Sequence, residues 1–198
     1  MPLFNFPVNL KFDEHIDSIV KKAKRQLGIM ARVFKARDVE TIIPLYKTFV
    51  RPILEYNYVI WSPYMKKHDQ KIERIQVKMC NLLENMSSLS YKAKLKKARL
   101  LTLRARRIKQ QLLTTFKIMN NDINLCFEDF FQENHFKKTR GNVFKLSLPK
   151  SRTKAYQNFF ASAVIRHWNK LKSSEFKVRT LNGFKININK YFVRAKIW

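Results

Sequence analysis

The scarcity of glycine constrains the fold of this chain more than any other feature. Only three glycines, Gly28, Gly141 and Gly183, occur among its 198 residues. Tight β-hairpin turns and phosphate-binding loops depend on the freedom of glycine to adopt positive φ angles, so this content argues against both. No Walker or dinucleotide-binding motif can be assembled from these positions. We therefore expect helices joined by loops.

Hydrophobic periodicity predicts helices along most of the chain. In residues 13–34 apolar side chains recur at three- and four-residue spacing, while lysines and arginines occupy the other face. Further helices are predicted over residues 39–50, 66–84, 91–99, 103–119, 156–171 and 180–193. Asp38 and Thr102 are the expected N-caps of the second and fifth helices. Pro44 and Pro52 each remove a backbone donor, so the second helix should kink or break near them.

One segment, residues 45–64 (LYKTFVRPILEYNYVIWSPY), carries only three charged residues in a chain with a formal net charge of +27. Its apolar residues would fall on nearly all sides of a helix, a pattern typical of a buried element. We expect it to be the central core element. Residues 120–131 are predicted to form a loop with a short helix, and residues 143–148 a short strand or extended segment.

These patterns predict a mainly α fold. A multi-helix bundle should be followed by a second small helical region with at most a short strand or hairpin. The expected divisions are an extended N-terminal segment (1–12), a first helical region (13–85), a basic helical region (86–121), a linker with a loop and short strand (122–155) and a C-terminal helical region (156–198).

The charge balance points to a polyanionic partner, since 41 Lys and Arg face only 14 Asp and Glu. A chain this basic repels itself unless it binds negative charge. Nucleic acid is the leading candidate, and an anionic membrane surface is a poorer one because nothing indicates a lipid anchor. No apolar run reaches the roughly 18 residues of a membrane-spanning helix. Alternatives that stay open are a merely solvated charged surface and compositional drift in a decaying gene.

The strongest local concentration of positive charge lies between Asn85 and Asn121, where ten Lys or Arg occur without an acid. Such side chains suit phosphate contacts, and arginine can also bind phosphate in a bidentate way. The residues predicted to contact the nucleic-acid backbone here are Lys94, Lys97, Arg99, Arg104, Arg106 and Arg107. A second predicted set is Lys137, Lys138, Arg140, Lys150, Arg152 and Lys154. Arg104, Arg107 and Gln111 are expected to share the solvent face of their helix.

Aromatic residues offer a second way to bind nucleic acid, because unpaired bases stack on them. Tyr156, Phe159, Phe160 and Trp168 recur at helical spacing, however, and this favours packing in the core. The same interpretation applies to Tyr56, Tyr58 and Trp61. We therefore expect salt-sensitive, sequence-independent binding rather than base recognition.

Nothing in the sequence predicts self-contained catalysis. His15, His68, His135 and His167 are scattered, without cysteine or aspartate at metal-ligand spacing. Glu128 and Asp129 are adjacent and should point in different directions. No Gly-x-Ser-x-Gly motif occurs. We expect no catalytic, metal-binding or cofactor-binding residues.

The cysteines favour a reducing compartment. Cys80 and Cys126 are too few for a disulfide framework and form no Cys-x-x-Cys pair. Cys80 is expected to be a small buried apolar residue. The N-terminal residues lack the pattern of a signal peptide. The expected location is intracellular, with nucleus and cytoplasm not distinguished.

Five segments in this order resemble part of a known family. They are residues 10–28, 45–64, 71–83, 89–108 and 139–171, and the similarity extends from about residue 10 to residue 191. The most specific are the Leu-Tyr-Lys…Arg-Pro-Ile-Leu-Glu-Tyr block and the Phe-Phe…Trp-Asn block. Together they resemble the part of non-LTR (LINE-type, jockey-like) retrotransposon polyproteins downstream of the reverse-transcriptase palm.

The resemblance implies a thumb region followed by a helical C-terminal region, with residues 1–12 as a remnant of the palm edge. In this family the thumb grips the template–primer duplex, and RNA and target DNA are the implied partners, with an intact polyprotein as another candidate. Family catalysis requires an Asp-Asp pair that holds Mg²⁺ ions, and this sequence contains no such pair. The resemblance therefore implies a non-catalytic fragment of an RNA-directed DNA polymerase, with Mg²⁺ needed only by the intact parent enzyme.

An alternative function follows from the apolar segments. If residues 45–64 and the aromatic stripe evolved to pack against an absent palm, the chain would expose apolar surface. It would then be a marginally stable remnant that acts only as an interaction or oligomerisation module, or that has no function.

Overall fold

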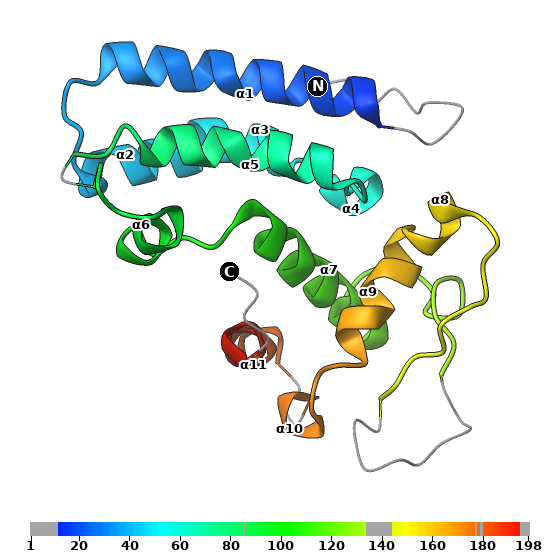
Figure 1. Ribbon diagram of the computed structural model, residues 1–198. Coiled ribbons are helices and arrows are strands. Elements are labelled where there is room, and N and C mark those ends of the chain that lie inside the picture. The colour runs from blue at the N-terminus through cyan, green and yellow to red at the C-terminus, as the bar shows by residue number, and fades with distance from the viewer. Residues whose placement is uncertain (1–11, 85, 134–143, 177, 179, 195–198) are drawn as a thin grey trace. The chain divides into compact units, whose positions relative to one another are not determined.

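The structure, a computed structural model, describes residues 12–84, 86–133, 144–176, 178 and 180–194 (Figure 1). It is mainly helical, as the sequence predicted, and within these ranges the only β pairing is an isolated bridge between Glu133 and Leu146. The chain divides into two compact units, Met1–Arg104 and Ala105–Trp198. Residues 86–104, which we had expected to form a region with residues up to 121, cluster with the first unit. Most of the expected N-terminal segment lies outside the described residues.

The longest helix of the first unit is α1, Asp13–Val33, which has the predicted extent almost to the residue. Its buried residues recur every three or four positions and are Ile16, Ile19, Ala23, Leu27 and Met30. This face packs against α5, Lys66–Cys80, and against the helices that follow α1. The predicted helix 66–84 thus ends four residues early, at Cys80.

Helices α1 and α5 run parallel to each other. At their N-terminal ends Asp13 Oδ1 lies 2.8 Å from His68 Nε2, and one turn further along Asp17 pairs with Lys71. Both helices advance in the same direction between the two contacts. Beyond the far ends, the Glu84 amide donates to the Arg37 carbonyl over 3.0 Å. Contacts at both ends therefore fix the register of the pair.

The second predicted helix, residues 39–50, forms in two pieces: α2, Val39–Leu45, and the π-helical turn η1, Tyr46–Val50. A further helix, α3, Arg51–Glu55, follows directly beyond the predicted range. Asp38 caps α2 by accepting a hydrogen bond from the Thr41 amide over 2.9 Å, and this bond lowers the pKa of Asp38. The π turn lies between Pro44 and Pro52, each of which removes one α-helical hydrogen bond. The expected kink or break takes this form.

Burial of residues 45–64 is one-sided. Tyr46, Val50, Leu54, Tyr58 and Trp61 are buried, and the last two belong to α4, Tyr58–Trp61. The large side chains that remain exposed are Phe49, Tyr56, Ile60 and Tyr64. The prediction of a segment buried on nearly all sides was therefore wrong. The buried residues recur every three or four positions, so one side of the segment faces the core and the other faces solvent. The helical path is interrupted at Asn57, which has a φ of 52°.

A buried polar network joins four elements of the first unit. The Tyr46 hydroxyl donates to Gln76 Oε1 over 2.9 Å, and Gln76 Nε2 donates to the Leu101 carbonyl over 3.0 Å. Glu73 Oε2 accepts from the amide of Leu103, the first residue of α7 (Leu103–Met119), over 3.0 Å, while its Oε1 accepts from the Tyr91 hydroxyl. Tyr91 opens α6, Tyr91–Lys97. This network connects α6 and the first residue of α7 to α5.

Two helices end with non-glycine residues in the left-handed conformation. Arg99 follows α6 with a φ of 51°, and the Leu100 amide donates back to the Leu95 carbonyl over 2.9 Å. Asn121 follows α7 with a φ of 55°. Glycine usually occupies this position of a Schellman cap. The glycine-poor chain therefore terminates these helices at the cost of some backbone strain.

The core of the second unit is built from aromatic rings. The rings of Phe116 and Phe184 stack at 4.2 Å, and those of Trp168 and Phe176 lie 4.8 Å apart. These residues come from α7, from α11 (Leu181–Arg194), from α9 (Phe160–Trp168) and from α10 (Ser173–Phe176). Between α7 and residue 133 the chain forms turns and bends, without the short helix that we predicted.

The Trp-Asn pair at the end of α9 holds an extended segment. Trp168 Nε1 donates to the Phe144 carbonyl over 2.8 Å. The Asn169 side chain accepts from the Leu146 amide and donates to the Leu146 carbonyl, both over 2.9 Å. Together with the isolated bridge, these bonds explain why residues 144–148 are extended without forming a sheet.

The predicted helix over residues 156–171 is interrupted. A short helix, α8 (Lys154–Gln157), ends before Phe159, whose ψ of 150° starts α9 afresh. Phe160 to Leu171 keep the predicted buried stripe, but Tyr156 and Phe159 are each 50% exposed. The prediction that these two rings pack in the core was therefore wrong, because the break rotates them off the buried face.

Candidate nucleic-acid interface

The structure removes two predicted residues from the accessible cations. Lys94 is only 7% exposed, and its ammonium donates to Asn81 Oδ1 over 2.7 Å. Arg107 is 3% exposed, and Gln111, expected on the same solvent face, is also buried. These side chains cannot contact a phosphate in this conformation. We had assigned Lys94 and Arg107 to the surface because they are charged. In the structure the aliphatic part of each side chain packs among buried residues instead.

The other predicted cations of residues 86–121 are more accessible. Lys97, Arg99 and Arg104 are exposed, and Arg106 is half-buried. Arg104 Nε lies 3.8 Å from Asp69 Oδ2, so part of its charge is already balanced. In the second predicted set Lys150, Arg152 and Lys154 are exposed. Lys137, Lys138 and Arg140 lie outside the described residues.

The parallel helices α1 and α5 place a different group of cations side by side. Beyond the Asp17–Lys71 contact, the following turns of the two helices carry Lys21 and Lys24 on α1 and Arg74 and Lys78 on α5, all exposed. We call these four residues the α1–α5 face. Helical spacing of three or four residues puts each pair on the same side of its helix as the contact that precedes it.

The acids of the first unit leave this face uncovered. Asp13, Asp17 and Asp69 pair with His68, Lys71 and Arg104, respectively. Glu55 pairs with Arg51 at 3.7 Å. Within the part of the chain that the structure describes, which includes all 14 acids, none forms an ion pair with the α1–α5 face.

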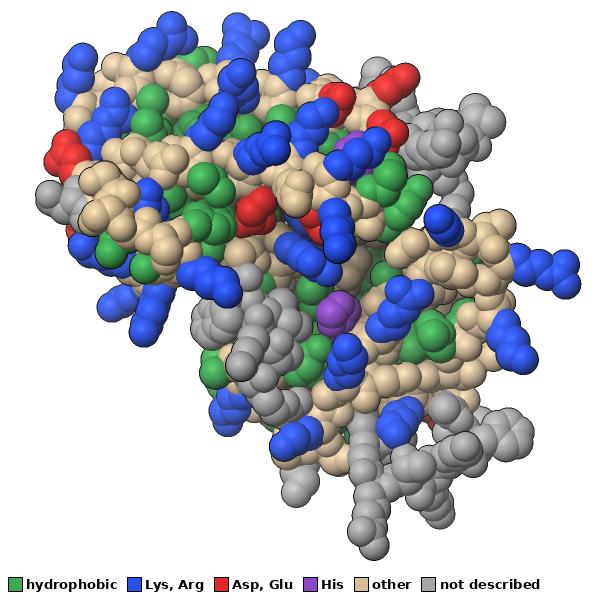
Figure 2. Space-filling model, in the orientation of Figure 1, with side chains coloured by type: hydrophobic (Ala, Val, Ile, Leu, Met, Phe, Trp, Pro, Cys, Tyr) green, Lys and Arg blue, Asp and Glu red, His purple; other side chains and the backbone are tan. Residues whose placement is uncertain are grey.

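Figure 2 shows the consequence for the first unit: Lys and Arg side chains outnumber the acids on the surface over α1 and α5, and several acids lie near the N-terminal end of α1. One feature of the sequence, the absence of acids over most of the first helix, could have predicted part of this face. From Asp17 to Asp38 there is no other acid. What it did not reveal was that α5 would lie alongside in parallel and add its own cations.

Two half-buried basic side chains, His15 and Lys109, are held by contacts within the fold. Burial, and secondarily the charge of Lys22, lowers the pKa of His15, whose ring lies 5.2 Å from that of Trp61. Burial also lowers the pKa of Lys109, with further contributions from Arg106 and Lys185, and its ammonium donates to Asn189 Oδ1 over 2.7 Å. We therefore leave both residues out of the candidate interface.

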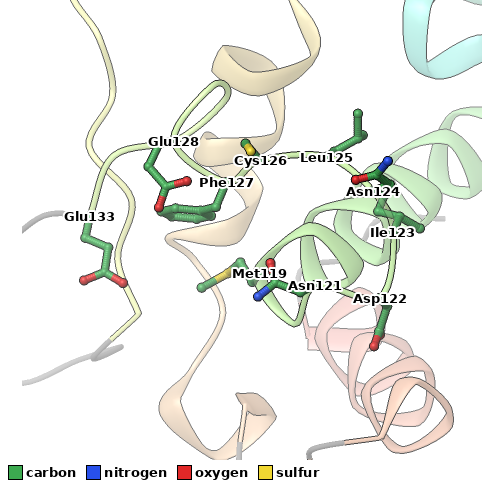
Figure 3. Close-up of a pocket in the computed structure, with 10 residues that line it drawn as sticks. All are labelled: Met119, Asn121, Asp122, Ile123, Asn124, Leu125, Cys126, Phe127, Glu128 and Glu133. Atoms are coloured by element: carbon green, nitrogen blue, oxygen red, sulfur yellow. The ribbon is translucent and has the colours of Figure 1, made fainter.

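A pocket of about 680 Å³ in the second unit lies beside the acidic loop that follows α7. Figure 3 shows that the carboxylates of Asp122, Glu128 and Glu133 lie apart in it and do not converge. Among the described residues no group of three or more His, Cys, Asp or Glu could hold a metal ion. The negative charge of this loop makes it a poor contact for phosphate.

Comparisons with protein-family models, with curated proteins and with solved structures gave no match to this chain. Among the helices that the structure describes, none combines the length and the apolar character needed to cross a membrane. The functional argument therefore depends on the residues themselves.

Proposed function

We propose that this chain binds the phosphate backbone of nucleic acid, independently of sequence, through the α1–α5 face. It would do so as a non-catalytic fragment of a retrotransposon RNA-directed DNA polymerase. The observation that supports the binding most directly is the arrangement of Lys21, Lys24, Arg74 and Lys78 on two parallel helices whose register is fixed at both ends.

Electrostatics favours this assignment. Four exposed cations without ion-paired acids concentrate positive potential, which attracts a polyanion and releases its condensed counterions on contact. The four side chains of the face are long and exposed, and side chains of this kind suit phosphate contact, so the proposal is for backbone contact alone.

The resemblance to the thumb and C-terminal region of LINE-type reverse transcriptases supports the choice of ligand. In that family the thumb grips a template–primer duplex, and α1, η1, α3 and α5 contain three of the segments that carry the resemblance. A helical first unit with a cationic surface is compatible with that role.

Salt titration tests the proposal. Binding of a labelled DNA duplex and of an RNA–DNA hybrid is measured by fluorescence anisotropy across a range of salt concentrations. The variant Lys21→Gln/Lys24→Gln/Arg74→Gln/Lys78→Gln should reduce the slope of log affinity against log salt by about 0.9 for each lost phosphate contact, about 3 to 4 in total.

A matched control removes the same charge elsewhere. Lys47, Lys66, Lys92 and Lys96 are four exposed cations of the same unit and are changed together to glutamine. This variant should keep most of the slope. Equal losses in both variants would mean that net charge, and not the α1–α5 face, drives binding.

A second candidate function is docking of another protein through exposed apolar side chains. Phe49 is 49% exposed, Tyr56 53%, Ile60 45% and Tyr64 41%. Apolar exposure on this scale from a single segment supports the interaction-module alternative. Sedimentation of the protein at rising concentration tests it: Phe49→Ser/Ile60→Ser should abolish any self-association, and a wild-type protein that stays monomeric throughout would count against docking to a second copy.

A further inference from the structure

In the second unit, residues of α8 and α9 line a small polar pocket. Its volume is about 310 Å³, and it is lined by Leu148, Pro149, Ser151, Gln157, Ser162 and Arg166. Arg166 Nη2 donates to the Gln157 carbonyl over 3.3 Å, and Gln157 Nε2 donates to the Ser151 carbonyl over 3.2 Å. These bonds hold three of the polar lining residues in a fixed arrangement.

Ser162 gives the pocket an unused hydrogen-bonding group. The residue is only 2% exposed, and its Oγ has no hydrogen-bond partner among the described residues. A buried hydroxyl without a partner costs roughly 1–3 kcal/mol, so such groups are rare in folded proteins. A ligand in the pocket would supply the missing partner.

The same pocket adjoins the N-terminal turn of α9. Ser162 is the third residue of this nine-residue helix, and the preceding residue Phe159 provides no side-chain cap. The first amides of a helix lack partners within it, and the helix dipole is positive at this end. Amides, a hydroxyl and the Arg166 guanidinium together form a favourable environment for an anion such as a phosphate.

Two exposed aromatic rings stand at the same break. Tyr156 and Phe159 are each 50% exposed, and their ring centroids lie 6.4 Å apart with planes inclined by only 18°. Exposed, nearly parallel rings are the feature on which unpaired bases stack. Duplex bases cannot use them, because their faces are already stacked within the helix.

The surrounding charge is positive. Lys150, Arg152 and Lys154 are exposed in the residues that lead into α8. After Glu133 the sequence contains one acid, Glu175, which is 5% exposed and accepts a hydrogen bond from the Lys172 amide. A backbone that passes along residues 150–154 therefore meets three exposed cations. The exposed acids Glu128 and Asp129 belong to the loop whose Phe130 and Phe131 rings pack against Phe160, so the path of the backbone has to avoid that loop.

From this arrangement we propose that the α8–α9 junction binds single-stranded nucleic acid. One phosphate enters the pocket formed by Ser162, Arg166 and the N-terminal turn of α9, and neighbouring bases stack on Tyr156 and Phe159. The choice of a nucleic acid as the anion rests on the proposed function, but the site and its preference for unpaired nucleotides are additional to it.

The test compares single strands with a duplex of equal length on the full chain. Affinities for labelled oligothymidine, oligouridine and the duplex are measured at physiological salt for wild type, Tyr156→Ala/Phe159→Ala and Ser162→Ala/Arg166→Gln. Stacking predicts about a tenfold loss of single-strand affinity for each ring removed, with duplex affinity changed less than twofold. The phosphate-pocket variant should lose about tenfold on both single strands.

Controls address general damage and general charge. Ile186→Ala/Tyr64→Ala removes two other exposed large side chains, and Lys190→Gln removes one other exposed cation of the second unit. Both should bind single strands like wild type, and all variants should melt within a few degrees of it. Oligothymidine and oligouridine affinities separate a preference for DNA from one for RNA.

The possible failures are distinguishable. If all variants keep duplex binding and Tyr156→Ala/Phe159→Ala binds single strands as tightly as wild type, the α8–α9 site is refuted and the proposed function stands. If the α1–α5 variant retains all duplex binding while the ring variant loses single strands, the proposed function fails and the α8–α9 site stands. Absence of binding to every probe overturns both.

Discussion

The two units share a basic composition but present it in different ways. In the first, cations project from the outer sides of two long parallel helices, and a hydrogen-bond network around Gln76 lies inside, together with two buried nitrogens, Arg37 Nη1 and His68 Nδ1, that have no hydrogen-bond partner among the described residues. In the second, the exposed features gather at a break between two helices, where aromatic rings and a buried, unpartnered hydroxyl accompany the cations. Regular helices produce a charged surface, whereas interrupted ones expose groups that can bind in more specific ways.

The largest effects should come from the two tryptophans that anchor the units. Trp61 is fully buried and donates to the Tyr56 carbonyl over 2.8 Å, and Trp168 is fully buried among Phe176 and Phe184. Either tryptophan-to-alanine change should cost about 3–5 kcal/mol of unfolding free energy. Hydrogen exchange followed by mass spectrometry should place the loss of protection mainly in the unit that carries the change. Uniform loss across both units would show that they unfold as one.

The cysteines provide a chemical comparison of the units. Burial raises the pKa of Cys80 to about 11, while Cys126 is exposed on the loop after α7. Because the thiolate is the reactive form, a rise of about two units from the ordinary value near 9.0 lowers the thiolate fraction about a hundredfold at pH 8. Iodoacetamide labelling of the native protein should modify Cys126 first and Cys80 at least about a hundredfold more slowly. Equal rates would contradict the burial of α5 in the first unit.

These outcomes also indicate what the sequence could and could not predict. Periodicity located α1 and α7 almost to the residue because a continuous apolar stripe marks each buried face. Periodicity also predicted a continuous helix across Phe159, because the aromatic spacing continues there, although the helical backbone is interrupted. A local pattern of side chains cannot reveal such a break when tertiary contacts cause it.

The candidate site was harder to predict than the fold. Charge density along the sequence singled out residues 86–121, but whether a cation is accessible depends on packing, as Lys94 and Arg107 illustrate. The α1–α5 face combines residues about fifty positions apart in the sequence, and only the Asp13–His68 and Asp17–Lys71 contacts reveal their register.

The smallest effects should come from comparing a satisfied buried polar group with an unsatisfied one. Gln76→Leu would leave the Tyr46 hydroxyl and the Leu101 carbonyl without their partner, at a cost of about 1–3 kcal/mol. Ser162→Ala removes a hydroxyl that has no partner among the described residues and should raise the free energy of unfolding by about 1–3 kcal/mol, the cost of leaving that hydroxyl unpaired. Urea denaturation of both variants measures the difference. A strongly destabilised Ser162→Ala would mean that the hydroxyl serves the fold rather than a ligand.

The most direct measurement of the central claim is the salt dependence of duplex binding in one variant and of single-strand binding in another. Neutralising Lys21, Lys24, Arg74 and Lys78 should reduce the slope for a DNA duplex by about 3 to 4, because each phosphate contact on a duplex contributes about 0.9. Changing Tyr156 and Phe159 to alanine should instead keep the slope for a single strand and shift that whole line to about hundredfold weaker affinity. Two variants that lower slope and affinity alike would contradict the account, since the two units would then bind through one undifferentiated charge effect.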